Sequence, residues 1–417
     1  MSPIKGSECG VGWNILTRLS QFHDVTALYA SGSQHGNNKS YAEAVKQYFT
    51  TSSQISGLTL INIDQPRKTK FIAYVNKMFE KLGPTGLPML YYLGYNYWQK
   101  AAFSRAKKLH KLENFDVVHQ LTQISFREPG YLWKLDIPFV WGPTGGISPL
   151  PKAMYKSLPW HFKILEIIRS FSNIYKFNLI PRLINANKKA SIIYAFSNQD
   201  ACKLKKRAKG EIKILLDVGT NIRGRSSSIN KKNTDVLQGI WCGRLSDYKA
   251  PAILLQALSL NNLTRNNIQF QIIGTGSLES SLIKMAQDLD LKNIEWIKQV
   301  KHEDVFELMS RADFFVHTSL REATSSVITE ALSMGLPVIC HDAYGMSIAI
   351  NETCGIKIPF ISPKESVQGF HNAMARIILD KDLLNELKEG AYKRSFEISW
   401  DKIAETIATD YLKIVNN

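Results

Sequence analysis

Short apolar runs alternate with amphipathic stretches along the second half of the chain. Five apolar runs predict buried strands, over residues 236–241, 268–273, 294–297, 314–317 and 338–340. Between them lie stretches with apolar residues at helical spacing, over residues 250–260, 278–289 and 305–311, and a further one that ends near Gly335. This alternation predicts the α/β fold class with a doubly wound parallel sheet. Such sheets bind their ligands beyond the carboxyl ends of the strands.

The first half has a similar but less regular pattern. Strands are predicted over residues 24–29, 58–63, 116–119, 139–141 and 191–196. A helix is expected from Gly12 to Leu19, after a glycine-containing loop over residues 6–12. A strand should precede that loop, but only a few residues are available for it. The polar residues 222–234 are typical of a linker between two domains.

The stretch from Glu322 to Glu330 has the most informative polar pattern. Ser325 and Ser326 can cap a helix, so one carboxylate is expected in the loop before it and the other one turn inside. The N–H groups at a helix start suit a phosphate, and carboxylates accept hydrogen bonds from sugar hydroxyls. A nucleotide sugar fits this layout. The alternative is an ordinary amphipathic helix with surface glutamates.

Two cations follow the first strand of the same half. In GRLSDYK, residues 243–249, Arg244 and Lys249 are expected in a strand-to-helix loop. A guanidinium and an ammonium there suit a pyrophosphate and would stabilise a leaving diphosphate. Plain surface charges are the alternative interpretation. Gly274, in the GTGS turn after the next strand, is a weak indication of a nucleotide site.

Two features of the first half are also candidates for binding. The loop that contains Gly10 and Gly12 could bring its backbone close to a phosphate, or could be an ordinary glycine-rich turn. His119 ends the strand DVVH, at the edge where ligands of this fold bind. A lone histidine can equally be structural.

Positive charge is concentrated in the first half. The net charge is +16, and residues 1–217 carry 30 Lys and Arg against 13 Asp and Glu, whereas the rest carries 22 against 23. This asymmetry indicates an anionic partner, such as phospholipid, nucleic acid or a phosphorylated substrate, or serves solubility alone. No apolar run is long enough to span a bilayer, and the first residues do not form a signal peptide. Five scattered cysteines without a CxxC pair favour a reducing cytoplasm over a zinc site.

Basic residues are interleaved with large apolar ones in two stretches. In the first stretch the large apolar residues fall at helical spacing, namely Trp160, Ile164, Ile167, Ile168 and Phe171. The other is a basic cluster after YYLGYNYW, namely Arg105, Lys107, Lys108 and Lys111. Both fit a surface that lies on a membrane. Helices packed on a core with one solvated face are the alternative.

Taken in order, these motifs resemble the retaining GT-B glycosyltransferases of family 4, the glycosyl transferases group 1, of the bacterial surface-polysaccharide type. The resemblance is clearest in GRLSDYK, IIGTGSLESSL and ELMSRADFFVHTSLREATSSVITEALSMGLPVI. It is looser in GSECGVGWNILTRLS, FDVVHQLT, WGPTGG and the closing FEISWDKIAETIATDYLKI. It implies a GT-B fold with two Rossmann-like domains that face a cleft. Residues 1–218 would bind the acceptor and 219–395 the nucleotide sugar, and 396–417 would cross back to the first domain.

The resemblance also implies roles for the matching residues. Arg244 and Lys249 correspond to diphosphate ligands, Glu322 to the glutamate that holds the donor sugar, and Glu330 to the one that holds ribose. His119 corresponds to a histidine near the donor sugar. The remaining matches are the backbone of the sugar-and-phosphate loop and of the glycine loop, at Ala323, Thr324, Ser325, Ser326, Gly10 and Gly12. Four places depart from the family. Ala250 replaces a common glycine, residues 323–325 replace Gly-Phe-Gly, Lys298 stands where a glycine is frequent, and residues 341–345 replace a run of small residues.

The implied reaction is transfer of a sugar, with retained configuration, from a UDP- or GDP-sugar to a lipid-linked or polysaccharide acceptor. Such an enzyme, of the hexosyltransferase type, would act in cell-surface glycan or lipopolysaccharide synthesis and need neither metal nor cofactor. We expect it in the cytoplasm, peripheral on the anionic inner face of the plasma membrane, without bound nucleic acid. The alternatives are a GT-B-related nucleotide-sugar epimerase and a non-catalytic basic protein that binds nucleic acid or sugar.

Overall fold

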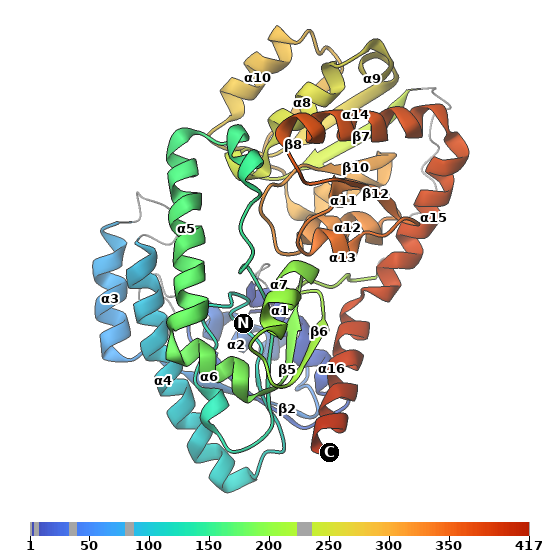
Figure 1. Cartoon of the computed structure of the whole chain (residues 1–417). Helices are drawn as coiled ribbons and strands as arrows, with labels where there is room; N and C mark the ends of the chain where they lie inside the picture. The colour runs from blue at the N-terminus through green and yellow to red at the C-terminus, as the bar shows by residue number, and fades with distance from the viewer. Residues whose placement is uncertain (1, 4–7, 33–39, 80–86, 223–235, 417) are drawn as a thin grey trace.

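Parallel sheets form the centre of both halves in the computed structural model, which describes residues 2–3, 8–32, 40–79, 87–222 and 236–416 (Figure 1). The second half holds one six-stranded sheet in the order β9-β8-β7-β10-β11-β12, and every pairing in it is parallel. Its strands are β7 (Leu237–Cys242), β8 (Ile268–Ile273), β9 (Ile294–Ile297), β10 (Phe314–His317), β11 (Val338–His341) and β12 (Gly355–Ile358). The predicted doubly wound parallel sheet is therefore confirmed, with β12 as an additional strand.

Helices connect these strands. They are α8 (Pro251–Ser259), α9 (Asn262–Asn267), α10 (Glu279–Asp288), α11 (His302–Arg311), α12 (Ser326–Ser333), α13 (Met346–Ala349), α14 (Pro363–Leu379) and the single-turn η4 (Asp247–Lys249). The α12 helix ends where the sequence predicts, because Gly335 adopts a left-handed φ of 70° just beyond it. Strands β10 and β11 are buried along their whole length, in keeping with three apolar residues followed by one histidine in each.

The first half contains two separate parallel sheets instead of one. The smaller sheet pairs β1 (Val25–Ala30) with β2 (Leu58–Ile63). The larger has the order β3-β4-β5-β6, with β3 (Val118–Gln120), β4 (Phe139–Thr144), β5 (Ala190–Ala195) and β6 (Glu211–Ile214). The helices of the first half are α1 (Glu8–Leu19), α2 (Ser40–Thr51), α3 (Arg67–Lys77), α4 (Pro88–Glu113), η2 (Leu132–Lys134), η3 (Lys152–Ser157), α5 (Trp160–Leu179), α6 (Pro181–Lys189) and α7 (Asn198–Lys205). The β6 strand was not predicted from the sequence.

The structure differs from the sequence predictions at the start of the chain. The first helix begins at Glu8 and not at Gly12, so Gly10 and Gly12 lie in helical turns and not in a loop. The apolar face of this helix, with Val11 and Ile15 buried, continues through its first turns and explains the early start. Residues 6 and 7 of the predicted glycine loop and 223–234 of the predicted linker lie outside the described residues.

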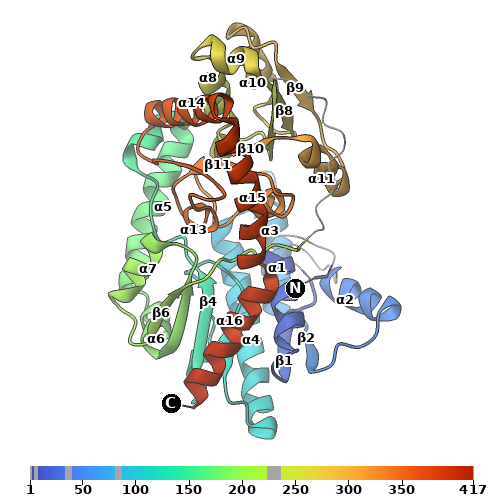
Figure 2. The same cartoon turned by 90° about the vertical axis from the view of Figure 1, so that its right-hand side faces the viewer.

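The last two helices, α15 (Lys381–Glu397) and α16 (Trp400–Val415), run from the second half to the first (Figure 2). The α16 helix packs against α1. Asp410 accepts a hydrogen bond from the hydroxyl of Tyr194 at 2.9 Å and pairs with Lys213 at 2.5 Å. The largest apolar cluster joins Ile15, Tyr194, Phe315 and Trp400, and so includes residues of both halves.

Candidate active site

The loops after β7 and β10 bring a cation and a carboxylate together. Lys249 ends the single turn η4, and its ammonium forms an ion pair with the carboxylate of Glu322. Both side chains are about a quarter exposed (25% and 24%), so a ligand can reach them. Strands β7 and β10 are neighbours in the sheet, and for that reason two residues 73 positions apart meet at its carboxyl edge.

Short hydrogen bonds fix these two loops to each other. The Thr318 hydroxyl donates to the carbonyl of Lys249 at 2.7 Å and accepts from the indole of Trp241 at 3.0 Å. The N–H of Leu320 donates to the carbonyl of Tyr248 at 2.7 Å. Arg244, earlier in the same loop, is exposed and has no ion pair or hydrogen bond with the residues that the structure describes. Its guanidinium is therefore available to an anion beside the pair.

The GTGS turn supports this arrangement. Gly274 has a φ of 140°, and a Cβ there would collide with the carbonyl oxygen of Gly243. The N–H of Leu245 donates to the carbonyl of Thr275 at 3.0 Å. The turn therefore lies directly against the backbone of the Arg244 loop, and only glycine permits this approach.

The segment between Glu322 and α12 is held from the first half of the chain. The Thr324 N–H donates to the Asp217 carboxylate at 2.9 Å, and Asp217 is 2% exposed. Burial raises the pKa of the Asp217 carboxyl to about 7, although its hydrogen bonds from Thr324 favour the charged form. Ala323 is fixed by its carbonyl, which accepts from the N–H of Gly345 at 3.1 Å.

The helix start itself differs in one respect from the prediction. Ser325 occupies the N-cap position of α12, but its side chain makes no capping hydrogen bond. Ser326 is the first helical residue and is exposed. Because the Ser325 side chain does not occupy them, the first N–H groups of α12 can donate hydrogen bonds to an anion.

Glu330 lies one turn inside α12, as predicted, and meets a residue that sequence reasoning missed. His302, at the start of α11, approaches the Glu330 carboxylate with its Nε2 at 2.9 Å. Glu330 is 20% exposed and His302 67% exposed. The second glutamate is therefore accessible at the same edge of the sheet as the first.

The candidate residues of the first half lie elsewhere. His119, on β3, uses both ring nitrogens: Nε2 lies 2.6 Å from the Gly142 carbonyl and Nδ1 lies 2.5 Å from the Tyr411 hydroxyl. The carbonyl can only accept, so Nε2 donates and Nδ1 accepts. Burial lowers the pKa of His119 to about 4, and the ring is neutral at pH 7. His119 and Gly12 both border a cavity between β1 and β3, and no contact joins either of them to the Lys249–Glu322 pair.

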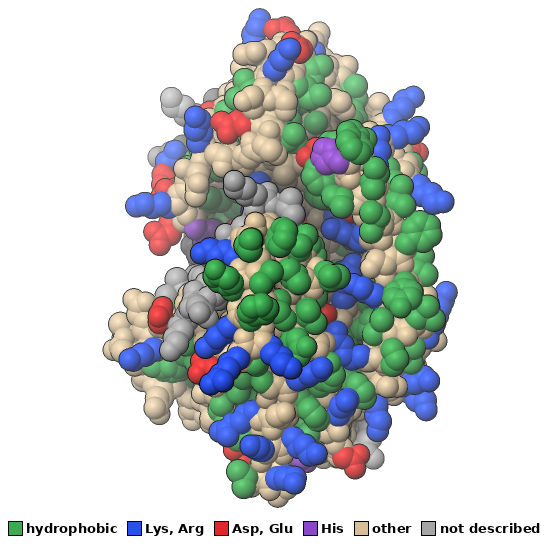
Figure 3. Space-filling model, turned by 90° about the vertical axis from the view of Figure 1, so that its left-hand side faces the viewer, with side chains coloured by type: hydrophobic (Ala, Val, Ile, Leu, Met, Phe, Trp, Pro, Cys, Tyr) green, Lys and Arg blue, Asp and Glu red, His purple; other side chains and the backbone are tan. Residues whose placement is uncertain are grey.

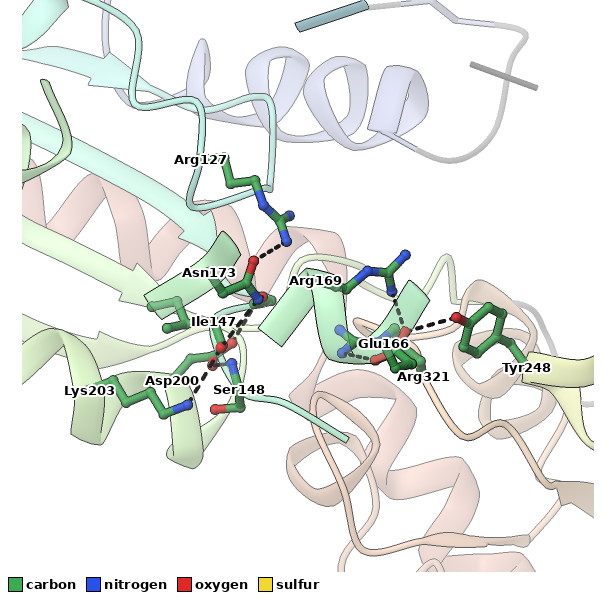
Figure 4. A network of polar contacts seen from close by, with 11 residues as sticks. Arg127, Ile147, Ser148, Glu166, Arg169, Asn173, Asp200, Lys203, Tyr248 and Arg321 are labelled. Atoms are coloured by element: carbon green, nitrogen blue, oxygen red, sulfur yellow. Dashed lines mark hydrogen bonds and ion pairs between the residues drawn. The ribbon is translucent and has the colours of Figure 1, made fainter. Parts of the chain in front are cut away.

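A buried glutamate on α5 connects the two halves beside the candidate site (Figure 4). Glu166 is fully buried and accepts hydrogen bonds from the hydroxyl of Tyr248 at 2.8 Å and from Arg321 at 2.9 Å. Arg169 of the same helix contributes a third contact at 2.9 Å. Tyr248 precedes Lys249 and Arg321 precedes Glu322, so Glu166 holds both loops at once. The sequence carried a signal that was not used, because Glu166 is the only acidic residue among the twenty of α5.

The loop WGPTGG is also anchored by a carboxylate (Figure 4). Asp200, fully buried on α7, accepts from the N–H groups of Gly146 at 2.6 Å and Ser148 at 2.8 Å. Gly146 has a left-handed φ of 81°. The loop is therefore a rigid turn, one of the two forms that the sequence allowed.

Across the described ranges, no group of three or more histidine, cysteine, aspartate or glutamate side chains is placed to hold a metal ion. Among the helices of those ranges, none has both the length and the hydrophobicity that crossing a bilayer requires.

Residues 223–394 match the family described as "Glycosyl transferases group 1". A D-inositol 3-phosphate glycosyltransferase of Streptomyces bingchenggensis is 28% identical over 188 residues, which cover 42% of this chain and 40% of that protein. A phosphatidylinositol N-acetylglucosaminyltransferase gpi3 subunit of Schizosaccharomyces pombe is 30% identical over 118 residues, 28% of this chain and 26% of that protein. The chain thus matches less than half the length of these curated relatives.

Solved structures resemble the chain along its whole length. HepE of Anabaena, crystallised with UDP, has a TM-score of 0.60 at 16% identity, covering 98% of each chain. A glycosyltransferase from Rickettsia africae has a TM-score of 0.61 at 16% identity, covering 98% of this chain and 95% of the other. These likenesses confirm the predicted GT-B fold. The match to the glycosyl transferases group 1 family thus lies within the second half of the chain.

Proposed function

We propose that the protein transfers a sugar from a nucleoside diphosphate sugar to an acceptor hydroxyl. The observation that carries this proposal is the pairing of Lys249 with Glu322 at the carboxyl edge of the sheet, next to the start of α12. A cation, exposed helix N–H groups and a carboxylate are the partners that a diphosphate and a sugar require. UDP is the ligand in the HepE crystal, which supports a uridine donor.

In this proposal each residue has a defined task. Arg244 and Lys249 bind the diphosphate and stabilise the charge that it gains on departure. Glu322 leaves Lys249 and accepts from hydroxyls of the donor sugar, and Glu330 leaves His302 and accepts from ribose. The backbone at Ala323, Thr324, Ser325 and Ser326 meets the sugar and phosphate.

The chemistry that we propose retains the anomeric configuration. The bond between the sugar C1 and the diphosphate oxygen breaks, and a bond from C1 to the acceptor oxygen forms on the same face. The acceptor proton passes to the departing diphosphate. No protein nucleophile is needed, and we propose that the two cations and the start of α12 take the place of a metal ion. Activity should therefore persist in excess EDTA.

We further propose that the acceptor is lipid-linked or a polysaccharide, met at the anionic cytoplasmic face of a membrane. The surface that supports this lies on α3, α4 and α5, where large apolar side chains are exposed among basic ones (Figure 3). Trp160 is 71% and Phe171 70% exposed, so this face of α5 is not packed on the core. Phospholipid headgroups attract such basic residues, and the interface takes up the apolar ones.

Donor binding tests the proposal directly. Titration calorimetry with a panel of UDP- and GDP-sugars should find one tight donor, whose Kd rises about 10-fold or more in Arg244→Ala and in Lys249→Ala. Turnover of that donor should fall about 100-fold in Glu322→Ala. Lys284→Ala, an exposed lysine of α10, is the matched control and should bind normally.

Two outcomes would contradict the proposal. Unchanged donor binding in both cation variants would remove the diphosphate site. An epimerised product from donor alone, without acceptor, would favour an epimerase. A gel shift at physiological salt checks the nucleic-acid alternative, and we expect none.

A further inference from the structure

A row of cations lies beside α5 and next to the candidate active site. Arg169 and Lys176 are seven positions apart on α5, so they lie on one side of the helix. Cations from other segments lie before, between and after them. In spatial order, this cation row consists of Arg321, Arg169, Arg127, Lys176 and Arg182.

Buried carboxylates pair with the cations at the two ends of the cation row. At one end, Glu166 pairs with Arg321 and Arg169, each at 2.9 Å. At the other end, Glu128 pairs with Arg182 at 3.0 Å. Both carboxylates are buried and are therefore held in place. Because Glu166 serves two arginines, a positive charge remains even at its end of the cation row.

The two cations in the middle of the cation row have no carboxylate. Arg127 donates to Ser125 and Asn173, which are neutral (Figure 4), and Lys176 lies over the ring of Tyr92. Among the residues that the structure describes, neither cation forms an ion pair. Burial lowers the pKa of both groups, and the neighbouring cations lower it further. Like charges held this close, away from full solvation, favour an anionic ligand between them.

Two guanidinium nitrogens of the cation row also lack a partner. Within the described ranges, Nε of Arg321 and Nη1 of Arg182 are buried and have no hydrogen-bond partner. A guanidinium nitrogen can only donate, so the partner that it lacks is an acceptor. Phosphate groups have acceptor oxygens on several sides and pair well with arginine.

Exposed apolar side chains continue the same side of α5. Leu165 lies one turn before Arg169, and Leu179 lies one turn after Lys176, and both leucines are exposed. Figure 3 shows basic side chains among apolar ones on this face of the molecule. A lipid phosphate needs both, because its head pairs with cations and its chain requires an apolar surface. A free phosphate would gain nothing from the apolar residues.

We propose that Arg169, Arg127 and Lys176 form a binding site for the diphosphate of a lipid-linked acceptor. Two cations without carboxylates suit a ligand that carries more than one negative charge. Arg321 extends the cation row to the candidate active site, because it directly precedes Glu322. A sugar attached to the diphosphate can therefore lie along the cation row towards the proposed donor. The acceptor role rests on the proposed function, whereas binding of the lipid diphosphate does not.

Titration calorimetry on the whole chain tests the site. The background is the double variant Arg244→Ala with Lys249→Ala, which lacks the proposed donor diphosphate site. The probe is farnesyl diphosphate, kept below the concentration at which it forms micelles. Its Kd should rise about 10-fold or more when Arg127→Gln or Lys176→Gln is added to this background. Lys188→Gln, at an exposed lysine of α6, makes the same change of charge and should bind the probe normally.

Two further probes identify the source of the phosphate. Inorganic pyrophosphate has the charge without the chain, and it should bind about 10-fold or more weakly than farnesyl diphosphate. Dihexanoyl phosphatidylglycerol has chains but a single negative charge, and it should also bind more weakly. Equal or tighter binding of either probe would overturn the proposal, because the ligand would then be a free phosphate or an ordinary membrane headgroup.

Thermal unfolding separates ligand binding from a structural role. Without ligand, Lys176→Gln should unfold at a temperature at least as high as the parent, because it removes a repulsion between cations. A lower midpoint with an unchanged Kd would show that Lys176 is structural and would overturn the proposal. An unchanged Kd in both Arg127→Gln and Lys176→Gln would overturn it as well. Normal donor binding in Arg244→Ala and Lys249→Ala would instead contradict the proposed function, and would leave the lipid diphosphate site in place.

Discussion

Ala250 has a backbone conformation that L-residues avoid. Its φ is 46°, in the left-handed region, at the junction between η4 and α8. The same residue is buried, so its methyl group contributes packing. The strain of about 1–2 kcal/mol offsets that packing. The loop that carries Lys249 requires a left-handed residue at position 250. In the family that the chain resembles, glycine is common at this place, and glycine adopts such a φ without strain.

We therefore expect Ala250→Gly to leave the free energy of unfolding within about 0.5 kcal/mol of the parent, since relief of strain balances the lost methyl and the added chain entropy. Ala257→Gly, at a fully buried helical position in α8, is the matched control. It relieves no strain and should lose about 1.5 kcal/mol. Urea denaturation measures both changes, and equal losses would refute the strain argument.

Asp217 gives stability a pH dependence. The folded pKa of this buried carboxyl is about 7, above its ordinary value of 3.8. Between these values the folded state binds a proton that the unfolded state has lost, so stability from this group is greatest at low pH and declines as pH rises towards 7. Asp217→Asn keeps an acceptor for Thr324 without a charge. Its thermal midpoint relative to the parent should be higher at pH 8 than at pH 5, and a difference that does not change with pH would contradict the shift.

At the scale of secondary structure, α5 links the two halves through one side chain. Glu166 holds Tyr248 and Arg321, and through them the loops of Lys249 and Glu322. A buried carboxylate that loses its charge leaves two arginines without their counter-ion. We expect Glu166→Gln to destabilise the protein by about 3 kcal/mol and to raise the Kd for the donor.

Tyr248→Phe is the matched comparison, because it removes a single hydrogen bond of the same network. It should lose about 1 kcal/mol. Thermal unfolding measures the stability of both variants and calorimetry their donor affinity. Donor binding that stays normal in Glu166→Gln, despite lower stability, would show that Glu166 does not position the site.

Features that depend on neighbouring residues could be predicted from the sequence, whereas contacts between residues far apart along the chain could not. The bounds of β2, β8, β9 and β10 follow from short segments rich in apolar residues, which are local signals. The proximity of Lys249 and Glu322 follows from sheet order, because both loops leave the same edge. The Glu166 and Asp217 contacts could not be predicted, since each joins residues more than a hundred positions apart or in different halves. The division of the first half into two sheets, with β1 and β3 in different ones, became visible only in the structure.

The exposed face of α5 leads to a prediction for the whole molecule. If it lies on a membrane, Trp160→Ser with Phe171→Ser should weaken binding to vesicles of anionic phospholipid by about 10-fold or more, because two large apolar side chains no longer enter the interface. Binding should also fall as salt rises. Co-sedimentation measures both effects.

Leu379→Ser is the control for this surface. Leu379 is 74% exposed, but it lies at the end of α14 in the second half, away from α5. Its loss should leave vesicle binding unchanged. Equal binding of the parent to neutral and anionic vesicles would contradict a charge-driven attachment.

The position of α16 has a consequence for how the molecule is made. This helix, the last of the chain, covers α1, the first, and its Asp410 pairs with Lys213. A ribosome that has finished residue 217 must still add about 200 residues before α16 is complete, which takes on the order of 10–40 s at usual rates of synthesis. Throughout that interval the nascent first half bears an uncovered apolar surface. We therefore expect the nascent first half to need chaperones during translation, because the helix that covers α1 is made about 200 residues later.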